Sequence, residues 1–185
     1  FGKINTNWKF LIENFIEPYH VQFVHKTTTN QPLKDHYTIV DGICYGSGVD
    51  VKKEDDKNNN ALSVTSRYLS LFPNFIIGSY FPNQIGVYLN IPISPGVTTQ
   101  KRIIYTTDGK TMSEKESDTV KKIWWSVHKE DHEMCERLQE GRSSPASNQG
   151  GLLSPYWEKG VQKFQKLIIE ATMKSSKTMK GKKNV

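Results

Sequence analysis

Two histidines and an acid lie close together near the start of the chain, in the stretch NFIEPYHVQFVH at residues 14–25. His20 and His25 are five positions apart, and Glu17 and Pro18 come just before the first of them. On a regular helix this spacing turns the second side chain about 140° away from the first, so the two could not bind one metal ion. Pro18 removes a helical hydrogen bond and pushes the turn open. We therefore expect a distorted backbone that could bring both histidines to one point.

A third candidate ligand lies much further along the chain. Apolar side chains recur at helical spacing over residues 120–138, and Asp131 takes the position where the next apolar residue would fall. A carboxylate on a buried helix face is costly unless it is paired, hydrogen-bonded or bound to a metal. Two imidazoles and one carboxylate, with other positions open, form the arrangement in which non-haem Fe(II) activates oxygen. The residues alone leave two interpretations open: an iron site formed by His20, His25 and Asp131, or ordinary packing of histidines near a helix end.

The elements that must position these residues indicate an α+β domain. An amphipathic pattern predicts a helix from Asn7 to Glu17, and residues 36–107 contain alternating segments that follow one another without helices. Such an order predicts an antiparallel sheet of about five or more strands, with a turn at the polar residues 52–60. A long helix is expected from Ser113, where SEKE forms a capping box, to Gly141. A final helix is expected to begin at SPYWE, with Ser154 as its N-cap and Pro155 as its first residue.

Composition narrows the class of protein. The net charge is +6, but five lysines lie in the tail, so the body is nearly neutral and no nucleic-acid partner is expected. We expect this tail, residues 174–185, to be disordered. No run of 18 apolar residues and no signal-peptide pattern is present, which argues against a membrane partner. Cys44 and Cys135 lack metal-binding or disulfide spacing, which predicts a reducing, cytoplasmic location. The tail lysines are Lys174, Lys177, Lys180, Lys182 and Lys183.

Residues 7–25, NWKFLIENFIEPYHVQFVH, closely resemble the signature of the catalytic domain in the large subunits of Rieske non-haem iron (ring-hydroxylating type) oxygenases. That pattern has an N-W-K opening, an E-N pair, an acid two positions before Y-H, and a second histidine five positions on. The stretch EDHEMCERLQEG and the later GGLLSPYWEKGVQKF resemble the family's second block. The resemblance implies a helix-grip (START/Bet v 1-like) sheet packed by long C-terminal helices over residues 1–173. The family's Rieske domain has no counterpart here, and we expect it to lie N-terminal in the full protein.

Individual roles follow from the resemblance, position by position. It implies that His20, His25 and Asp131 bind Fe(II), and that Glu17 passes an electron from a Rieske [2Fe-2S] cluster on a neighbouring subunit toward that iron. Asn14 and Tyr19 match family positions that line the site. A glutamate rather than an aspartate at position 17 is similar to the branch that acts on choline, carnitine and betaine-type substrates.

The implied activity is that of an oxygenase. The resemblance implies that Fe(II), O2 and Rieske-derived electrons hydroxylate or N-demethylate a small organic substrate, such as a quaternary ammonium compound. A reductase and a homotrimer are implied as well, and the chain alone would be inactive without its Rieske domain. Two alternatives stay open: a dioxygenase that hydroxylates aromatic rings, and a non-catalytic helix-grip protein that binds a small molecule without iron.

The sequence contains other histidines, acids and aromatic residues that could take part in binding or catalysis, and we interpret most of them as structural. His36, His128 and His132 are expected at the surface or the sheet edge, and Glu130 is the alternative ligand to Asp131. The segment EGRSSPASNQGG could form a loop over a cavity. Strand tyrosines could form a cation–π box, although strand parity alone does not tell which face inward, and the tryptophans are expected in the core. These aromatic residues are Tyr68, Tyr80, Tyr88 and Tyr105, and Trp124, Trp125 and Trp157.

Overall fold

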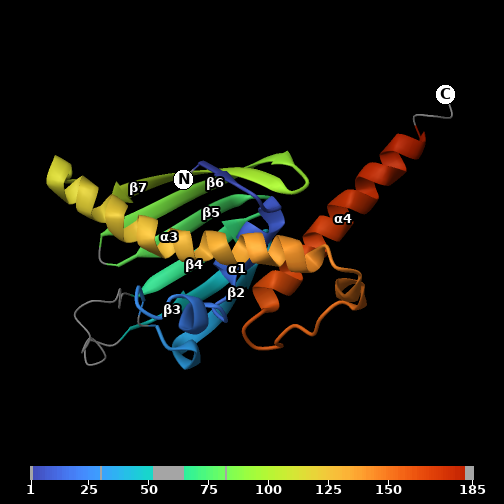
Figure 1. Cartoon of the computed structure of the whole chain (residues 1–185), viewed down its shortest axis with the longest axis horizontal. Coiled ribbons are helices and arrows are strands. Elements are labelled where there is room, and N and C mark those ends of the chain that lie inside the picture. The colour runs from blue at the N-terminus through green and yellow to red at the C-terminus, as the bar shows by residue number, and fades with distance from the viewer. Residues whose placement is uncertain (1, 30, 52–64, 82, 182–185) are drawn as a thin grey trace.

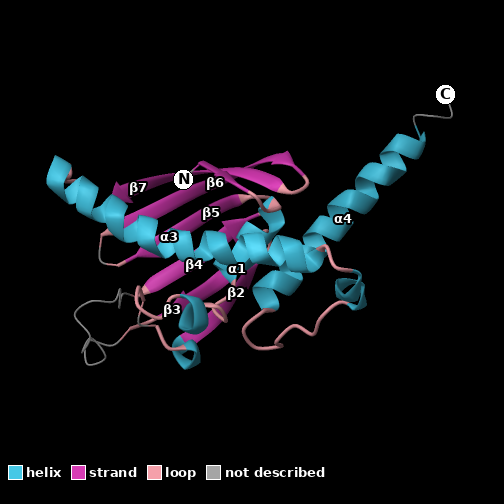
Figure 2. Cartoon of the chain, viewed as in Figure 1, coloured by secondary structure: helices cyan, strands magenta, loops and turns pink. Residues whose placement is uncertain are grey.

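The structure is a computed structural model that describes residues 2–29, 31–51, 65–81 and 83–181, with side chains as far as residue 175. Within this part, seven strands form one antiparallel sheet in the order β1-β7-β6-β5-β4-β3-β2 (Figures 1 and 2). The α+β fold predicted from the sequence is thereby confirmed. The strands are β1 (Gly2–Ile4), β2 (His36–Asp41), β3 (Cys44–Val49), β4 (Ser66–Leu71), β5 (Phe75–Tyr80), β6 (Gln84–Ser94) and β7 (Val97–Thr106).

A long helix crosses the sheet and a shorter one packs between them. In Figure 1, α3 lies across the front of the sheet, and α1 contacts α3 as well as strands β3, β4 and β6. The beginning of the last helix packs on β2 and β3, and the helix then projects away from the sheet. The helices are α1 (Trp8–Ile16), α2 (Val21–Val24), α3 (Glu114–Arg142) and α4 (Lys159–Gly181), with short 3-10 helices at Leu33–Asp35 and Pro145–Gln149.

Capping side chains set the ends of α1 and α3. Asn7 accepts a hydrogen bond from the backbone N–H of Lys9, which satisfies one of the free donors of the first turn of α1. Ser113 and Glu116 form the predicted capping box at the start of α3. The predicted bounds of both helices are therefore correct to within one residue.

The main hydrophobic core lies between α1, α4 and the sheet. Ile12 and Ile16 of α1 pack against Tyr45 of β3, Ile76 of β5 and Phe164 of α4, and each of these side chains is at most 1% exposed. Burying apolar side chains of this size contributes roughly 1.5–3 kcal/mol each. The α1 helix is thus fixed to the sheet just before the chain reaches Glu17 and the two histidines.

The side chains of strand β6 alternate between the two faces of the sheet, as the alternating sequence pattern predicts. Tyr88 and Asn90 are buried under the helices, whereas Leu89 and Ile93 point to the other face and are 41% and 61% exposed. The covered face of β6 therefore carries aromatic and polar side chains, which suit the lining of a cavity rather than a dry core.

The C-terminal part of the chain differs from the prediction. Helix α4 begins at Lys159, not at Ser154, whose hydroxyl instead accepts from the backbone N–H of Trp157 at 3.2 Å in a separate turn. The helix also continues as far as Gly181, into the segment expected to be disordered. The predicted turn at residues 52–60 and the last four residues lie outside the described part of the chain. None of the helices that are described has the length and apolar character needed to cross a membrane.

Candidate metal centre

The backbone between the two histidines is broken where Pro18 predicts. Helix α1 ends at Ile16, and Glu17 has the extended conformation (φ −100°, ψ 141°) that the residue before a proline prefers. One helical turn, α2, then follows. His20 and His25 are its N-cap and C-cap residues, so they lie at opposite ends of a single turn rather than on one helix face.

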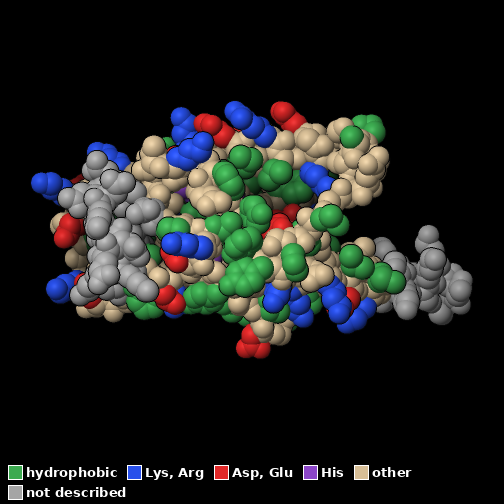
Figure 3. All heavy atoms as spheres, turned by 90° about the horizontal axis from the view of Figure 1, so that it is seen from below, with side chains coloured by type: hydrophobic (Ala, Val, Ile, Leu, Met, Phe, Trp, Pro, Cys, Tyr) green, Lys and Arg blue, Asp and Glu red, His purple; other side chains and the backbone are tan. Residues whose placement is uncertain are grey.

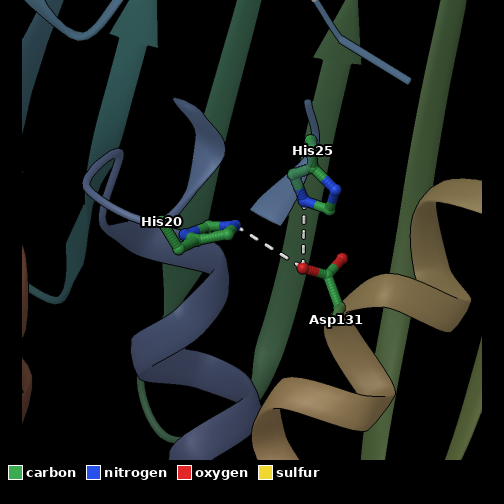
Figure 4. A group of neighbouring side chains, drawn as sticks. All are labelled: His20, His25 and Asp131. Atoms are coloured by element: carbon green, nitrogen blue, oxygen red, sulfur yellow. Dashed lines mark ion pairs between the residues drawn. The ribbon is translucent and has the colours of Figure 1, made fainter. Parts of the chain in front are cut away.

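The break brings both imidazoles to the same carboxylate (Figure 4). Nε2 of His25 lies 3.0 Å and Nε2 of His20 lies 3.5 Å from Oδ1 of Asp131. One potential ligand atom from each of the three residues lies within 4.8 Å of the other two. Metal–ligand bonds of about 2.0–2.2 Å require neighbouring ligand atoms roughly 3–4 Å apart, so the two nitrogen–oxygen distances and the two-histidine, one-carboxylate set fit a divalent transition metal.

The other ring nitrogen of each imidazole, Nδ1, contacts a further carboxylate. Nδ1 of His20 lies 2.6 Å from Oε1 of Glu17, and Nδ1 of His25 lies 2.7 Å from Oε2 of Glu130. Thr28 donates to the same oxygen of Glu130 at 2.7 Å. Because Nδ1 donates to a carboxylate, Nε2 is directed at Asp131 and suited to bind a metal. Glu130, the alternative ligand in the sequence analysis, contacts the outer side of His25.

The electrostatics of the three residues are coupled. Burial lowers the pKa of His25, but its hydrogen bonds and proximity to Asp131 and Glu130 outweigh this and raise the pKa to about 9. Burial likewise raises the pKa of Asp131, whereas His25, His20 and Asn14 lower it below its usual range. A buried carboxylate that stays ionised is the anionic ligand that a divalent cation requires.

Of the two residues expected to line the site, one touches it. Asn14 is buried and donates from Nδ2 to Oδ1 of Asp131 at 3.0 Å. Tyr19 is 41% exposed, and its ring packs against Trp157 with the centroids 5.6 Å apart. Tyr19 therefore belongs to the surface beside the site, and the expectation that it lines the cavity is wrong.

A cavity extends from the three candidate ligands between α3 and the sheet. Its free volume is about 70 Å³. This is enough space for about five water molecules or one small organic molecule. Three of the four tyrosines considered in the sequence analysis line it, whereas Tyr105 is 52% exposed and does not. The lining includes Phe15, Gln31, Tyr68, Tyr80, Tyr88, Gln100, Arg102 and Trp124.

Two histidines that we expected at the surface or the sheet edge line this cavity. His36 does lie in the edge strand β2, although it is buried, whereas the expectation for His128 of α3 is wrong. His36 is 1% and His128 is 5% exposed, and burial lowers their pKa values to about 4 and about 2, so both are neutral near pH 7. Nε2 of His128 lies 2.5 Å from Nε2 of the half-buried His132. The expectation that Trp125 is in the core is also wrong, because it is 54% exposed. The loop EGRSSPASNQGG contributes no residue to the cavity lining that the structure describes.

Substitution of Glu130 tests whether the carboxylate that contacts Nδ1 of His25 contributes to metal binding. Replacing Glu130 by alanine is expected to weaken Fe(II) binding about 10–100-fold, because Nδ1 of His25 loses its acceptor and the ring loses its fixed orientation. Competition with a chelator under anaerobic conditions measures the affinity. Thr28→Val is the matched control, since it removes only a hydrogen bond to Glu130 and should have a smaller effect. Unchanged affinity in Glu130→Ala would refute the orienting role.

The antiparallel sheet covered by helices and the cluster of two histidines and one carboxylate can be compared with known protein families. The family model described as ring hydroxylating alpha subunit (catalytic domain) matches residues 3–173. The chain therefore belongs to this family, and the resemblance noted in the sequence is confirmed.

Curated relatives and solved structures agree with this membership. The chain is 27% identical over 168 residues to the chloroplastic choline monooxygenase of Atriplex hortensis, covering 87% of this chain and 36% of the relative. A structure of the quaternary ammonium Rieske monooxygenase CntA superposes with a TM-score of 0.71 at 17% identity, over 91% of this chain and 46% of that one. Dicamba monooxygenase gives 0.68 at 16% identity, over 95% and 58%. The chain thus spans about a third of its curated relatives and about half of these structures.

Proposed function

We propose that this chain is the iron-binding catalytic unit of an oxygenase, with Fe(II) held by His20, His25 and Asp131. The observation that carries the proposal is the convergence of two Nε2 atoms and one carboxylate oxygen within 4.8 Å. The outer carboxylates Glu17 and Glu130 support it, because each fixes one imidazole in the orientation that a metal needs. Bound Fe(II) would supply the activation of O2 that inserts oxygen into a substrate C–H bond.

The chain's own residues would prepare the site for this reaction. Asn14 holds Oδ1 of Asp131 at 3.0 Å and so orients the carboxylate. The ring of Phe15 lies edge to face with Tyr68, at 5.5 Å between centroids, and tilted against Tyr88, at 5.1 Å, in the same cavity lining as the candidate ligands. These rings would exclude bulk water and confine a small substrate next to the metal.

Electrons would reach the iron through Glu17 from the Rieske [2Fe-2S] domain of a neighbouring subunit in a homotrimer, with a reductase as their source. The bond from Oε1 of Glu17 to Nδ1 of His20, at 2.6 Å, supports this path because it connects the acid to a candidate ligand. The nearby surface suits a partner, since Tyr19 and Phe23 are 41% and 59% exposed. Hydrophobic side chains also gather in the middle of the face seen from below in Figure 3. Alone, the chain would lack this electron supply and would not turn over with O2.

The substrate would be a small organic molecule that is hydroxylated or N-demethylated. The matches to choline monooxygenases and to CntA make quaternary ammonium compounds the first class to test. An aromatic substrate is the second candidate, because phenyl-sized rings suit an aromatic lining.

Hydrogen peroxide offers a test that does not need the Rieske domain. It contains oxygen at the level of O2 plus two electrons and two protons, so R–H and H2O2 can give R–OH and water. The iron-loaded chain is expected to oxidise choline, carnitine or γ-butyrobetaine with peroxide, and to give no product with O2 alone; mass spectrometry detects the product. Metal-free chain is the control. If the loaded chain binds these compounds and yields no oxidised product, a non-catalytic binding protein becomes the better explanation.

A further inference from the structure

A partly buried arginine, Arg102, lines the cavity from strand β7. Arg102 pairs across the sheet with Tyr88 of β6, and its Nε and Nη2 atoms are shielded from solvent. Gly86 leaves the space for this head group, because a Cβ atom there would lie 3.2 Å from Nη2 and 3.4 Å from Nε. The glycine at position 86 thus leaves room in the cavity wall for the planar guanidinium group of Arg102.

The guanidinium occupies the aromatic cluster formed by Tyr80, Tyr88 and Trp124. Its central carbon lies 4.1 Å from the ring centroid of Trp124, 4.3 Å from that of Tyr88 and 5.9 Å from that of Tyr80. These distances are those of cation–π contacts. A quaternary ammonium group in the same cluster would compete for the same ring faces and lie beside a like charge, which is unfavourable.

The other charges of the cavity lie at the opposite, metal-binding side. The two carboxylates in its lining, Glu17 and Asp131, contact His20 and His25. Arg102 is the only lysine or arginine among the described lining residues. Trp124, which stacks on Arg102, and Asp131 lie seven residues apart on α3, so about 10 Å of helix separates the two sides. A molecule in this cavity therefore meets candidate metal ligands on one side and a fixed positive charge on the other.

We propose that Arg102 is a specificity-determining residue that binds a carboxylate or similar anionic group of the substrate and directs the substrate's other end toward His20, His25 and Asp131. A guanidinium donates to a carboxylate through two parallel N–H groups, and stacking on Trp124 and Tyr88 fixes the plane of this fork. The inference rests on the proposed oxygenase function for the meaning of the metal side, but the anion preference can be measured without turnover.

Three ligands of equal size separate charge from shape: pentanoate, its neutral amide pentanamide, and choline. Calorimetry or quenching of tryptophan fluorescence measures their binding to the iron-loaded chain. Wild type is expected to bind pentanoate at least about 10-fold more tightly than pentanamide or choline, because hydrogen bonds between two charged groups are stronger than those to a neutral group. Arg102→Met should remove this preference, and Arg102→Lys should retain part of it.

Each other result overturns the inference. Equal binding of pentanoate and pentanamide by wild type would refute it even if Arg102→Met failed to fold, and so would tighter binding of choline. A preference for pentanoate that persists in Arg102→Met would mean that the carboxylate binds elsewhere, for example to the metal. Iron content of the same samples tests the proposed function separately, so loss of iron with a retained, Arg102-dependent anion preference would reject the oxygenase and keep the anion site.

Discussion

Asp131→Asn is expected to abolish stoichiometric iron binding by the chain. The substitution keeps the volume and the contact with Asn14 but removes the negative charge from the point where the two Nε2 atoms meet. Removing an outer partner of a metal ligand typically costs 10–100-fold in affinity, so the loss of a ligand should cost more than about 100-fold. His20→Ala should behave in the same way. Iron per chain after anaerobic loading and desalting is the measurement.

Two controls on the same helix make the result specific. Asp118→Asn changes an exposed carboxylate of α3 that pairs with Lys121 at 3.2 Å and precedes Asp131 by more than three helical turns. His132→Asn changes the immediate neighbour of Asp131. Both variants should bind as much iron as wild type. If His132→Asn lost the iron while Asp131→Asn kept it, the third ligand would be His132, and a wild-type chain without iron at any loading would refute the metal site altogether.

Local rules account for much of what the sequence predicted. The capping box at Ser113 and the stripe along α3 depend only on neighbours within a few residues, and they led to Asp131 as an inward-facing acid, which is 19% exposed at the side chain. The effect of Pro18 is equally local, because it forces the preceding Glu17 out of the helical conformation. These features could be inferred before any tertiary contact was known.

Features that depend on tertiary packing could not be inferred in this way. Strand parity divides β6 into two sets of side chains, but only the position of α1 and α3 decides which set is covered. The covered set proved to be the polar and aromatic one, because it surrounds a cavity. His128 was expected at the surface or the sheet edge for the same reason: a buried polar side chain resembles an exposed one in the sequence. Ser154 shows a second limit of prediction from local sequence. Its hydroxyl makes the expected capping contact, but this contact caps an isolated turn and not helix α4.

Glu17→Gln is expected to separate electron delivery from oxygen chemistry. The amide keeps the shape of the side chain and can still contact Nδ1 of His20, so iron binding should fall by less than about 10-fold. Product formation driven by hydrogen peroxide should be largely retained. Turnover driven by O2 and a reduced Rieske domain should fall by about 100-fold, the upper end of what an outer partner usually contributes. The ratio of peroxide-driven to electron-driven rates is therefore the decisive measurement.

Glu130→Gln is the matched control, because this residue has the same contact with the other histidine, 2.7 Å from Nδ1 of His25, and no proposed part in the electron path. An acid that only orients an imidazole affects the metal site itself, so Glu130→Gln should lower both rates by the same factor. Glu17 directly precedes the surface segment that contains the exposed Tyr19, so it could connect that surface to His20, whereas Glu130 contacts His25 and Thr28 on α2 and the loop after it. If Glu17→Gln also lowered both rates equally, Glu17 would be a positioning residue, and the electron would have to enter by another route.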